Sequence, residues 1–168
     1  MMKVSNIFWT VDIYIMNNKI IFLDVDGVLN SAEFSHWLWD NHEKKYRGYE
    51  MLDQRAILCL QDIVFVTGAK IVLSSSWRIS SLRTKQLEEQ LLPYGLEIID
   101  RTISDASGGR GEEVKEWLSR HPEVSHFVIL DDDDDFKDEE LKKHFVQTTF
   151  YRGLLEEHVD KAIEILSN

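Results

Sequence analysis

The feature that most constrains this chain is a run of apolar residues that ends in two aspartates and a glycine. Residues 20–29 read Ile-Ile-Phe-Leu-Asp-Val-Asp-Gly-Val-Leu, with Asp24 and Asp26 two positions apart. Four consecutive apolar residues bounded by a turn signal indicate a strand buried on both faces, as in a parallel sheet. In open α/β folds, ligands bind at the carboxyl ends of such strands. Carboxylates this close repel one another, so the pair predicts a site shared with a cation, a proton or both.

Apolar runs alternate with helical patterns along the rest of the chain, an order typical of βαβ units with a parallel sheet. Strands are predicted over residues 20–25, 70–74, 97–99, 124–130 and 145–149. Helices are predicted from Asp53 to Gly68, from Ser80 or Ser81 to Pro93, over 111–120 and over 155–166. Asp53 is a favourable N-cap residue, and Gly68 suits the left-handed turn that ends a helix. The 168 residues are enough for one α/β domain, which we place at 19–168.

Charge and composition exclude several functional classes. The net charge is −11, and eight acidic residues with one lysine in residues 131–140 supply much of it. An acidic balance opposes non-specific binding to nucleic acid. The single cysteine, Cys59, cannot form an intrachain disulfide, which favours a cytoplasmic location. No apolar run approaches the ~20 residues of a membrane span, and residues 1–18 form an N-terminal extension to which the pattern assigns neither structure nor a secretory signal.

Three more polar clusters follow predicted strands or precede a predicted helix, and with the aspartates they predict one crevice. The serines at 74–76 end the second strand, where hydroxyl groups and backbone amides can donate hydrogen bonds to a phosphoryl oxygen. Arg110 follows two glycines just ahead of a helix, where its cation can neutralise a phosphate and a carboxylate. Asp131 and Asp132 end the fourth strand with oxygen ligands that suit a hard cation such as Mg²⁺. Two plainer interpretations stay open, in which the serines cap a helix and Arg110 is a solvated loop residue.

These clusters stand in the order of the four motifs of the haloacid dehalogenase-like (HAD) superfamily, which the chain resembles. The motifs are matched, in order, by Asp24-Val25-Asp26-Gly27-Val28-Leu29, by Ser75, by Arg110 and by Asp131-Asp132. More narrowly, the chain is similar to the HAD domain family named for Swiss Army Knife RNA-repair proteins. This similarity is carried by Leu-Ser-Ser-Ser-Trp-Arg, Arg-Gly-Glu-Glu-Val, Val-Ile-Leu-Asp-Asp-Asp and the late Gly153-Leu154. It covers about residues 19–166.

The resemblance implies a Rossmann-like, three-layer α/β sandwich with a mainly parallel central sheet and a minimal cap. It implies a Mg²⁺-dependent phosphomonoester hydrolase in which Asp24 attacks phosphorus and forms an aspartyl phosphate, while Asp26 acts as general acid and base. Ser75 would bind the phosphoryl group. Arg110 would supply the cation at a position where the family more often has lysine, and Lys115 is the alternative.

The resemblance also implies a metal site and further contacts with substrate. Mg²⁺ would bind Asp24, the backbone carbonyl of Asp26 and Asp132, with Asp131 beside them. Further substrate contacts are expected from Gly27, Ser74, Ser76, Arg78 and Arg47. Ser74 is also the alternative to Ser75 as the second-motif hydroxyl.

Residues 30–51 follow the first motif and would form the short flap over the site. Aromatic and basic residues are concentrated there, namely Phe34, Trp37, Trp39, Tyr46, Arg47 and Tyr49. Such rings can stack on a planar substrate group, but we favour a role in anchoring the segment on the core. The segment is too short for a large cap domain, so the sequence predicts a relatively open site.

The sequence thus predicts a HAD-type phosphatase that acts on a phosphorylated substrate, and two other functions stay open. One is a nucleic-acid end phosphatase in RNA or DNA repair, which the acidic charge opposes. The other is a binding or regulatory module that keeps the pocket without turnover. The intact pair of Asp24 and Asp26 argues against such a module, because binding alone does not need an acid and base.

Overall fold

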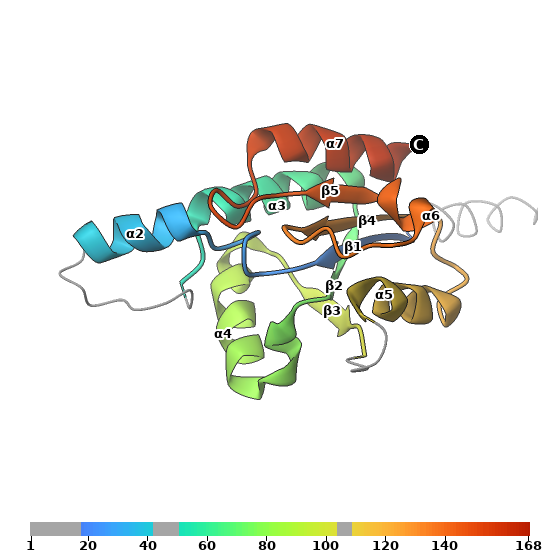
Figure 1. Ribbon diagram of the computed structural model, residues 1–168, viewed down its shortest axis with the longest axis horizontal. Coiled ribbons are helices and arrows are strands. Elements are labelled where there is room, and N and C mark those ends of the chain that lie inside the picture. Colours follow the sequence, from blue (N-terminus) through green and yellow to red (C-terminus); the bar gives the residue numbers. More distant parts are fainter. Residues whose placement is uncertain (1–17, 42–50, 104–108) are drawn as a thin grey trace, which may run out of the picture.

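The computed structural model describes residues 18–41, 51–103 and 109–168, which build a parallel sheet with helices on both faces. The strands are β1 (Lys19–Leu23), β2 (Lys70–Leu73), β3 (Ile98–Arg101), β4 (His126–Asp131) and β5 (Phe145–Gln147). Their spatial order is β3-β2-β1-β4-β5, and every neighbouring pair is parallel (Figure 1). After β3 the chain crosses to the other side of β1. The carboxyl ends of β1 and β4 therefore form the switch point at which such folds bind ligands.

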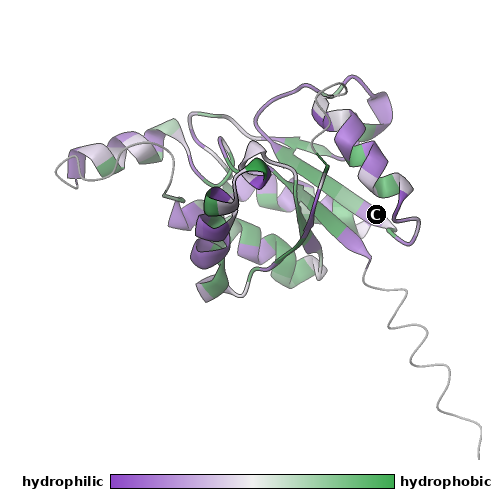
Figure 2. Ribbon diagram, turned by 90° about the horizontal axis from the view of Figure 1, so that it is seen from below, coloured by the Kyte–Doolittle hydropathy of each residue, from purple (hydrophilic) through white to green (hydrophobic). Residues whose placement is uncertain are grey.

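Two hydrophobic clusters cover the two faces of this sheet. The helices are α2 (Ala32–Asn41), α3 (Gln54–Thr67), α4 (Ser81–Leu91), α5 (Gly109–Ser119), α6 (Glu139–Lys142) and α7 (Glu156–Ser167), with 3-10 turns η1 (Ser76–Ile79) and η2 (Leu92–Tyr94). Ile21 and Leu23 of β1 pack with α3, α4 and α7, whereas Ile20 and Phe22 pack with α5 and α6. Successive strand residues point to opposite faces, so β1 is apolar throughout. Figure 2 shows hydrophobic strands between helices of mixed hydropathy, which confirms the predicted fold class.

Several predicted element ends differ from the structure by a few residues, and two of these differences lie next to the predicted site residues. β1 ends at Leu23 rather than at residue 25, because the carbonyl of Val25 turns out of the sheet and accepts hydrogen bonds from the amides of the next turn. α5 begins at Gly109 rather than at residue 111. Arg110 therefore lies in the first turn of a helix and not in a loop ahead of it.

α2 is a helix that the sequence pattern did not predict. It extends away from the sheet (Figure 1), and Leu38 is its one buried side chain. Its first amides, those of Ala32 and Glu33, each donate a hydrogen bond of 3.0 Å to the carbonyls of Phe150 and Tyr151. Phe34, Trp37 and Leu38 do stand at helical spacing in α2, but this set is too short for periodicity alone to indicate a helix.

The N-terminal extension predicted for residues 1–18 lies, except for its last residue, outside the described residues. No helix in the described part of the chain combines the length and the hydropathy that a membrane crossing would require.

Candidate active site

Two acidic strand ends lie side by side at the carboxyl edge of the sheet. Asp24 follows β1, Asp131 is the last residue of β4, and the Asp24 amide donates a hydrogen bond of 3.0 Å to the carbonyl of Leu130. Both side chains are nearly inaccessible, with 4% of Asp24 and 1% of Asp131 exposed. The buried parallel strands therefore carry both carboxylates into the interior of the predicted crevice.

Gly27 lets the chain turn closely against the end of β4. Its φ of 76° lies in the left-handed region, which favours glycine, and a β-carbon at this position would collide with the carboxylate of Asp132. The Gly27 amide donates to Asn30 Oδ1 at 3.0 Å, and its carbonyl accepts from Thr148 Oγ1 at 2.6 Å. Gly27 thus brings Asp132 against the first loop, while its contact with substrate stays a prediction.

Arg110 bridges the two buried carboxylates. Its Nη1 lies 2.9 Å from Asp24 Oδ1 and 2.5 Å from Asp131 Oδ2. Lys115, the alternative cation, instead pairs with Glu112 at 3.1 Å and with Asp138. Of these two candidates, the structure places Arg110 at the acidic residues and Lys115 among surface ion pairs.

Asp24, Asp131 and Asp132 form an acidic cluster whose ligand oxygens lie within 4.8 Å of one another. Burial is the largest cause that raises the pKa of all three carboxyl groups, and the charge of Asp24 adds to the increase at Asp131 and Asp132. The pKa of Asp131 rises to about 7. Repulsion within the cluster is what a divalent cation would relieve, so the three residues could hold a metal.

The three carboxylates differ in how open they are to a metal. Asp131 Oδ1 accepts the amide of Asp133 at 3.0 Å, and its Oδ2 faces Arg110. Both oxygens of Asp131 are therefore occupied by protein donors. The carboxylate of Asp132 is partly exposed and lines the hollow at this edge. This difference favours Asp132 over Asp131 as a direct ligand, while Asp24, which is also bound by Arg110 and Ser75, stays a predicted ligand.

Asp26 is held by two residues that sequence reasoning missed. Asn30 Nδ2 donates to Asp26 Oδ1 at 2.8 Å, and Trp77 Nε1 donates to Asp26 Oδ2 at 3.0 Å. The Asp26 side chain lines the same hollow as Asp24 without joining the acidic cluster. Asn30 lies in the turn after the first motif and Trp77 lies just after the serines, so proximity to the motifs was the available signal.

Ser75 combines both interpretations that the sequence left open. Its buried side chain forms a hydrogen bond with Asp24 and also accepts the amide of Trp77 at 3.3 Å, capping η1. Ser74 is equally buried, and its hydroxyl has no hydrogen-bond partner over the described residues. Ser76 is exposed and lines the hollow. Ser75 is therefore the serine of this run that contacts the predicted nucleophile.

Arg78, a predicted substrate ligand, forms ion-pair and hydrogen-bond contacts within the protein. Its side chain is 7% exposed, with Nη2 at 2.5 Å from Glu113 Oε2 and Nη1 donating to the carbonyl of Ser75 at 2.6 Å. Burial lowers the pKa of Arg78 while Glu113 opposes that change. The side chain therefore holds η1 against α5 through Glu113. Arg78 also lines one of the hollows at this edge, and its contact with substrate stays a prediction.

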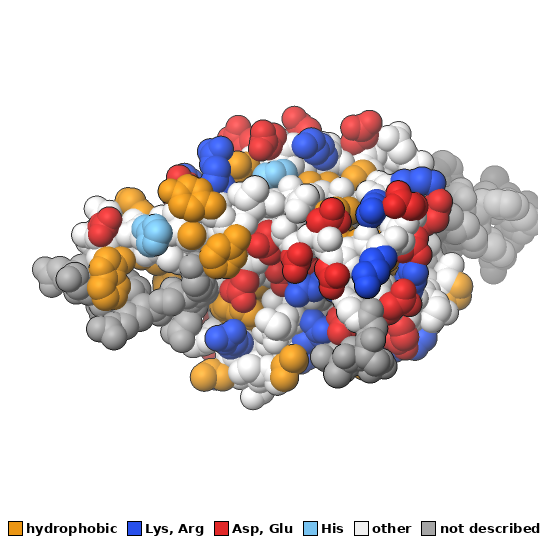
Figure 3. Space-filling model, viewed as in Figure 1, with side chains coloured by type: hydrophobic (Ala, Val, Ile, Leu, Met, Phe, Trp, Pro, Cys, Tyr) orange, Lys and Arg blue, Asp and Glu red, His pale blue; other side chains and the backbone are white. Residues whose placement is uncertain are grey.

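Two small adjoining hollows open at this edge, and we call them together the acidic hollow. One has a volume of about 320 Å³ and is lined by Asp24, Asp26, Ser76, Arg110, Asp131, Asp132, Asp133 and Phe150. The other, of about 260 Å³, is lined by Ser76, Arg78, Ile79, Arg110, Glu113, Asp131, Asp133 and Asp135. Figure 3 shows acidic and basic side chains gathered on this face, with hydrophobic ones between them and α2. Arg47, a predicted substrate ligand, lies outside the described residues.

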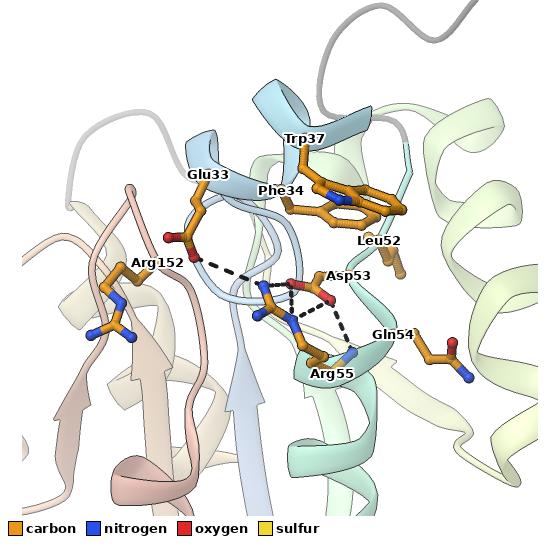
Figure 4. A pocket seen from close by; sticks show the side chains of 8 residues that line it. All are labelled: Glu33, Phe34, Trp37, Leu52, Asp53, Gln54, Arg55 and Arg152. Atoms are coloured by element: carbon orange, nitrogen blue, oxygen red, sulfur yellow. Dashed lines mark hydrogen bonds and ion pairs between the residues drawn. The ribbon is translucent and has the colours of Figure 1, made fainter. Parts of the chain in front are cut away.

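A larger hollow of about 750 Å³, the α2 hollow, lies beside α2 (Figure 4). Its lining consists of Glu33, Phe34, Trp37, Leu52, Asp53, Gln54, Arg55 and Arg152. The rings of Phe34 and Trp37 stack with centroids 6.0 Å apart, and 53% of Trp37 is exposed. Phe150 lines the acidic hollow and Arg152 the α2 hollow, so one short segment borders both.

The chain has the architecture of a HAD-like domain. Its parallel sheet has helices on both faces and carries paired aspartates at its switch point, together with a hydroxyl, a cation and a second acidic strand end. More narrowly, residues 20–159 match the model of the family described as the HAD domain in Swiss Army Knife RNA repair proteins, and the chain belongs to this family. The match confirms the resemblance seen in the sequence and indicates a hydrolase of the phosphatase type. No curated protein and no solved structure matches the chain significantly.

Proposed function

We propose that this chain is a Mg²⁺-dependent phosphomonoester hydrolase that works through an aspartyl phosphate. The observation that carries the proposal is the setting of Asp24. Its carboxylate is hydrogen-bonded by Ser75 and paired with Arg110 at 2.9 Å, and it lines a hollow that Asp26 also lines. A nucleophile, a cation for phosphoryl oxygens and a second carboxyl group therefore meet at one opening.

In the first step, a carboxylate oxygen of Asp24 attacks phosphorus, and the bond between phosphorus and the leaving oxygen breaks. Asp26 donates its proton to the leaving oxygen, so that an alcohol departs. In the second step, Asp26 takes a proton from a water molecule whose oxygen attacks phosphorus. The bond between phosphorus and the Asp24 oxygen then breaks. Inorganic phosphate leaves, and both aspartates return to their starting forms.

The residues around Asp24 fit a hard divalent cation, because they offer carboxylate oxygens within 4.8 Å of one another in a buried setting. Asp24, Asp132 and the backbone carbonyl of Asp26 would hold Mg²⁺. Bound Mg²⁺ would screen the phosphate from the carboxylates and stabilise the charge that develops on its oxygens. Arg110 would contribute the same kind of stabilisation.

A second candidate function is the removal of phosphate from nucleic-acid ends. The description of the matched family, which names RNA repair, favours it. The stacked rings of Phe34 and Trp37 line the α2 hollow and offer a surface for a planar base. The net charge of −11 opposes it, since a strand of phosphates is repelled by an acidic protein. We therefore rank a smaller phosphorylated substrate first.

The proposal is tested by hydrolysis of p-nitrophenyl phosphate with Mg²⁺ and with a chelator. Asp24→Asn keeps the shape of the side chain and removes the nucleophile, so the rate should fall at least about a thousandfold. Asp100→Asn is the matched control, because the Asp100 carboxylate accepts a hydrogen bond from Trp117 at 2.8 Å in a different part of the sheet. Near-normal turnover by Asp24→Asn would contradict the proposal.

A substrate panel separates the remaining alternatives. It contains phosphorylated metabolites, phosphopeptides and oligonucleotides with terminal phosphates. A preference for oligonucleotides over mononucleotides of the same base would establish the second candidate. Binding of these compounds without turnover of any of them, in folded protein supplied with Mg²⁺, would identify a binding module instead.

A further inference from the structure

Trp77 connects the hydrophobic core to the candidate active site. Its side chain is 1% exposed and packs in the cluster shared with α3 and α7, yet its indole Nε1 donates to Asp26 Oδ2 at 3.0 Å. A buried indole needs an acceptor for its N–H, and here the acceptor is a carboxylate at the lining of the acidic hollow. We propose that Trp77 is a positioning residue that sets the direction in which Asp26 exchanges its proton. This inference rests on the proposed function.

The other oxygen of Asp26 is fixed by a donor that is itself held in place. Asn30 is fully buried, its Nδ2 donates to Asp26 Oδ1 at 2.8 Å, and its Oδ1 accepts the amide of Gly27 at 3.0 Å. The last contact fixes which end of the Asn30 amide faces Asp26. Each oxygen of Asp26 therefore meets one N–H group, from an indole on one side and from an amide on the other.

Neither of these partners can take a proton from Asp26. An indole N–H is a donor only, and the amide nitrogen of asparagine likewise only donates. A proton on Asp26 can therefore pass only to a group in the acidic hollow, which is where the leaving oxygen and the attacking water would lie. The two donors thus hold the Asp26 carboxyl group in one orientation, in which it exchanges its proton with the substrate side of the acidic hollow.

The same 3-10 turn also positions the other aspartate. Trp77 donates its backbone amide to Ser75 Oγ at 3.3 Å, and the Ser75 side chain is hydrogen-bonded to Asp24. Arg78, the next residue, anchors η1 to α5 through Glu113. Ser75, the N-cap of η1, therefore contacts Asp24 through its hydroxyl, and Trp77 within η1 contacts Asp26 through its indole. The two contacts together set the relative placement of the two carboxyl groups.

The chain offers a matched control for the loss of one indole N–H. Trp117 is 2% exposed, and its Nε1 donates to Asp100 Oδ2 at 2.8 Å. Trp77→Phe and Trp117→Phe therefore remove the same kind of hydrogen bond, from a buried ring to an aspartate, at two different places. The kcat/KM of each variant is measured on a series of phosphate monoesters whose leaving groups range from p-nitrophenol to simple alcohols.

Trp77→Phe should lose about tenfold to a hundredfold in kcat/KM on alkyl phosphates and much less on p-nitrophenyl phosphate, because a poor leaving group depends on well-placed proton donation. Trp117→Phe should change both substrates by the same factor. The ratio of the two activities is taken within one preparation, so partial unfolding cancels from it. An unchanged ratio in Trp77→Phe would overturn the inference and leave Trp77 a core residue.

Two further measurements keep this test decisive. Replacing Trp77 by 3-benzothienylalanine exchanges the N–H for sulfur in a ring of nearly the same shape, so it answers the question even if Trp77→Phe does not fold. Asp26→Asn should show the same dependence on the leaving group, to a larger degree. If Asp26→Asn loses equally on all leaving groups, the proposed role of Asp26 fails, and that result is distinct from a failure at Trp77 alone.

Discussion

The acidic hollow and the α2 hollow are built in opposite ways. The first is lined by side chains at the ends of buried strands, and Arg110 links Asp24 and Asp131 across it. The second lies beside α2, whose one buried side chain is Leu38. The first amides of α2 donate hydrogen bonds to the carbonyls of Phe150 and Tyr151. The side chains proposed to act on the phosphate are thus anchored in the core, whereas the residues that line the α2 hollow can change with little cost to the stability of the fold. Substitutions in the acidic hollow should lower turnover, and those in the α2 hollow should alter substrate affinity.

After the loss of the nucleophile Asp24, the largest effect is expected from Arg110. Arg110→Ala removes the cation that lies between two buried carboxylates and would face the phosphoryl oxygens, so kcat/KM should fall by about 10²–10³-fold. Lys115→Ala is the matched control, because Lys115 contacts Glu112 and Asp138 outside the acidic cluster. Circular dichroism and steady-state kinetics on both variants check this. Equal losses would show that the acidic hollow extends to Lys115, and the contrast between the two regions would weaken.

The next effect concerns metal binding and stability. Mg²⁺ should raise the Tm of the protein by several °C at saturating concentration, because it binds the native state alone. The increase should be larger at pH 8 than at pH 6, since protons compete for carboxyl groups whose pKa is raised, that of Asp131 to about 7. A pH-independent increase would indicate that the cation binds elsewhere on the acidic surface.

The choice of ligands is tested by calorimetry on two neighbouring aspartates. Asp132→Ala should weaken Mg²⁺ binding strongly, because Asp132 lies in the acidic cluster. Asp133→Ala should have a small effect, because Asp133 contacts the cluster through its backbone amide, which donates to Asp131 at 3.0 Å and is retained in the variant. Equal weakening would place the metal site further along the acidic run.

A smaller effect is expected in the α2 hollow. Trp37→Ala should raise KM for the preferred substrate about threefold to tenfold and leave kcat for p-nitrophenyl phosphate nearly unchanged, because a small substrate does not extend to the exposed ring. Phe65→Ala is the control, since Phe65 is an aromatic residue 87% exposed on α3 and outside either hollow. Loss of turnover of the small phosphate in folded Trp37→Ala would make α2 part of the catalytic machinery.

The contrast between side chains at the ends of buried strands and side chains held by distant contacts also explains which features the sequence could predict. The strands and the places of Asp24 and Asp131 follow from buried runs that end in charged residues, and Arg110 follows from two glycines ahead of a helical pattern. Both patterns depend on local sequence alone. The contact of Trp77 with Asp26 could not be assigned, because a side-chain hydrogen bond between residues 51 positions apart leaves no periodic signal. Asn30 lies only four positions from Asp26, but a hydrogen bond within a turn leaves no periodic signal either. α2 escaped prediction for a related reason: it is held by backbone contacts with residues 150–151, which no pattern within α2 reports.

The smallest effect concerns α7, the helix that follows the segment of Phe150 and Arg152. His158 is nearly buried in the first turn of α7, and its Nδ1 accepts the amide of Leu155 at 3.0 Å. Burial is the main cause that lowers the pKa of His158 below its ordinary value. As pH falls through about 6.5, the ordinary pKa of histidine, the unfolded chain gains a proton that the native chain resists, so this contribution to stability is lost.

His158→Asn keeps an acceptor near the position of Nδ1 and removes the titration, so its Tm should fall less between pH 7 and pH 5.5 than that of the unaltered protein, by roughly 2–4 °C. The Tm of the variant is compared with that of the unaltered protein at each pH, because Asp131 changes the stability of both in the opposite sense to His158. The raised pKa of Asp131 means that the native state holds a proton which the unfolded state has lost, so Asp131 favours the native state as pH falls. His36→Asn, at an exposed position of α2, is the control and should follow the unaltered protein. Parallel Tm curves for all three proteins would show that α7 begins without help from a neutral His158.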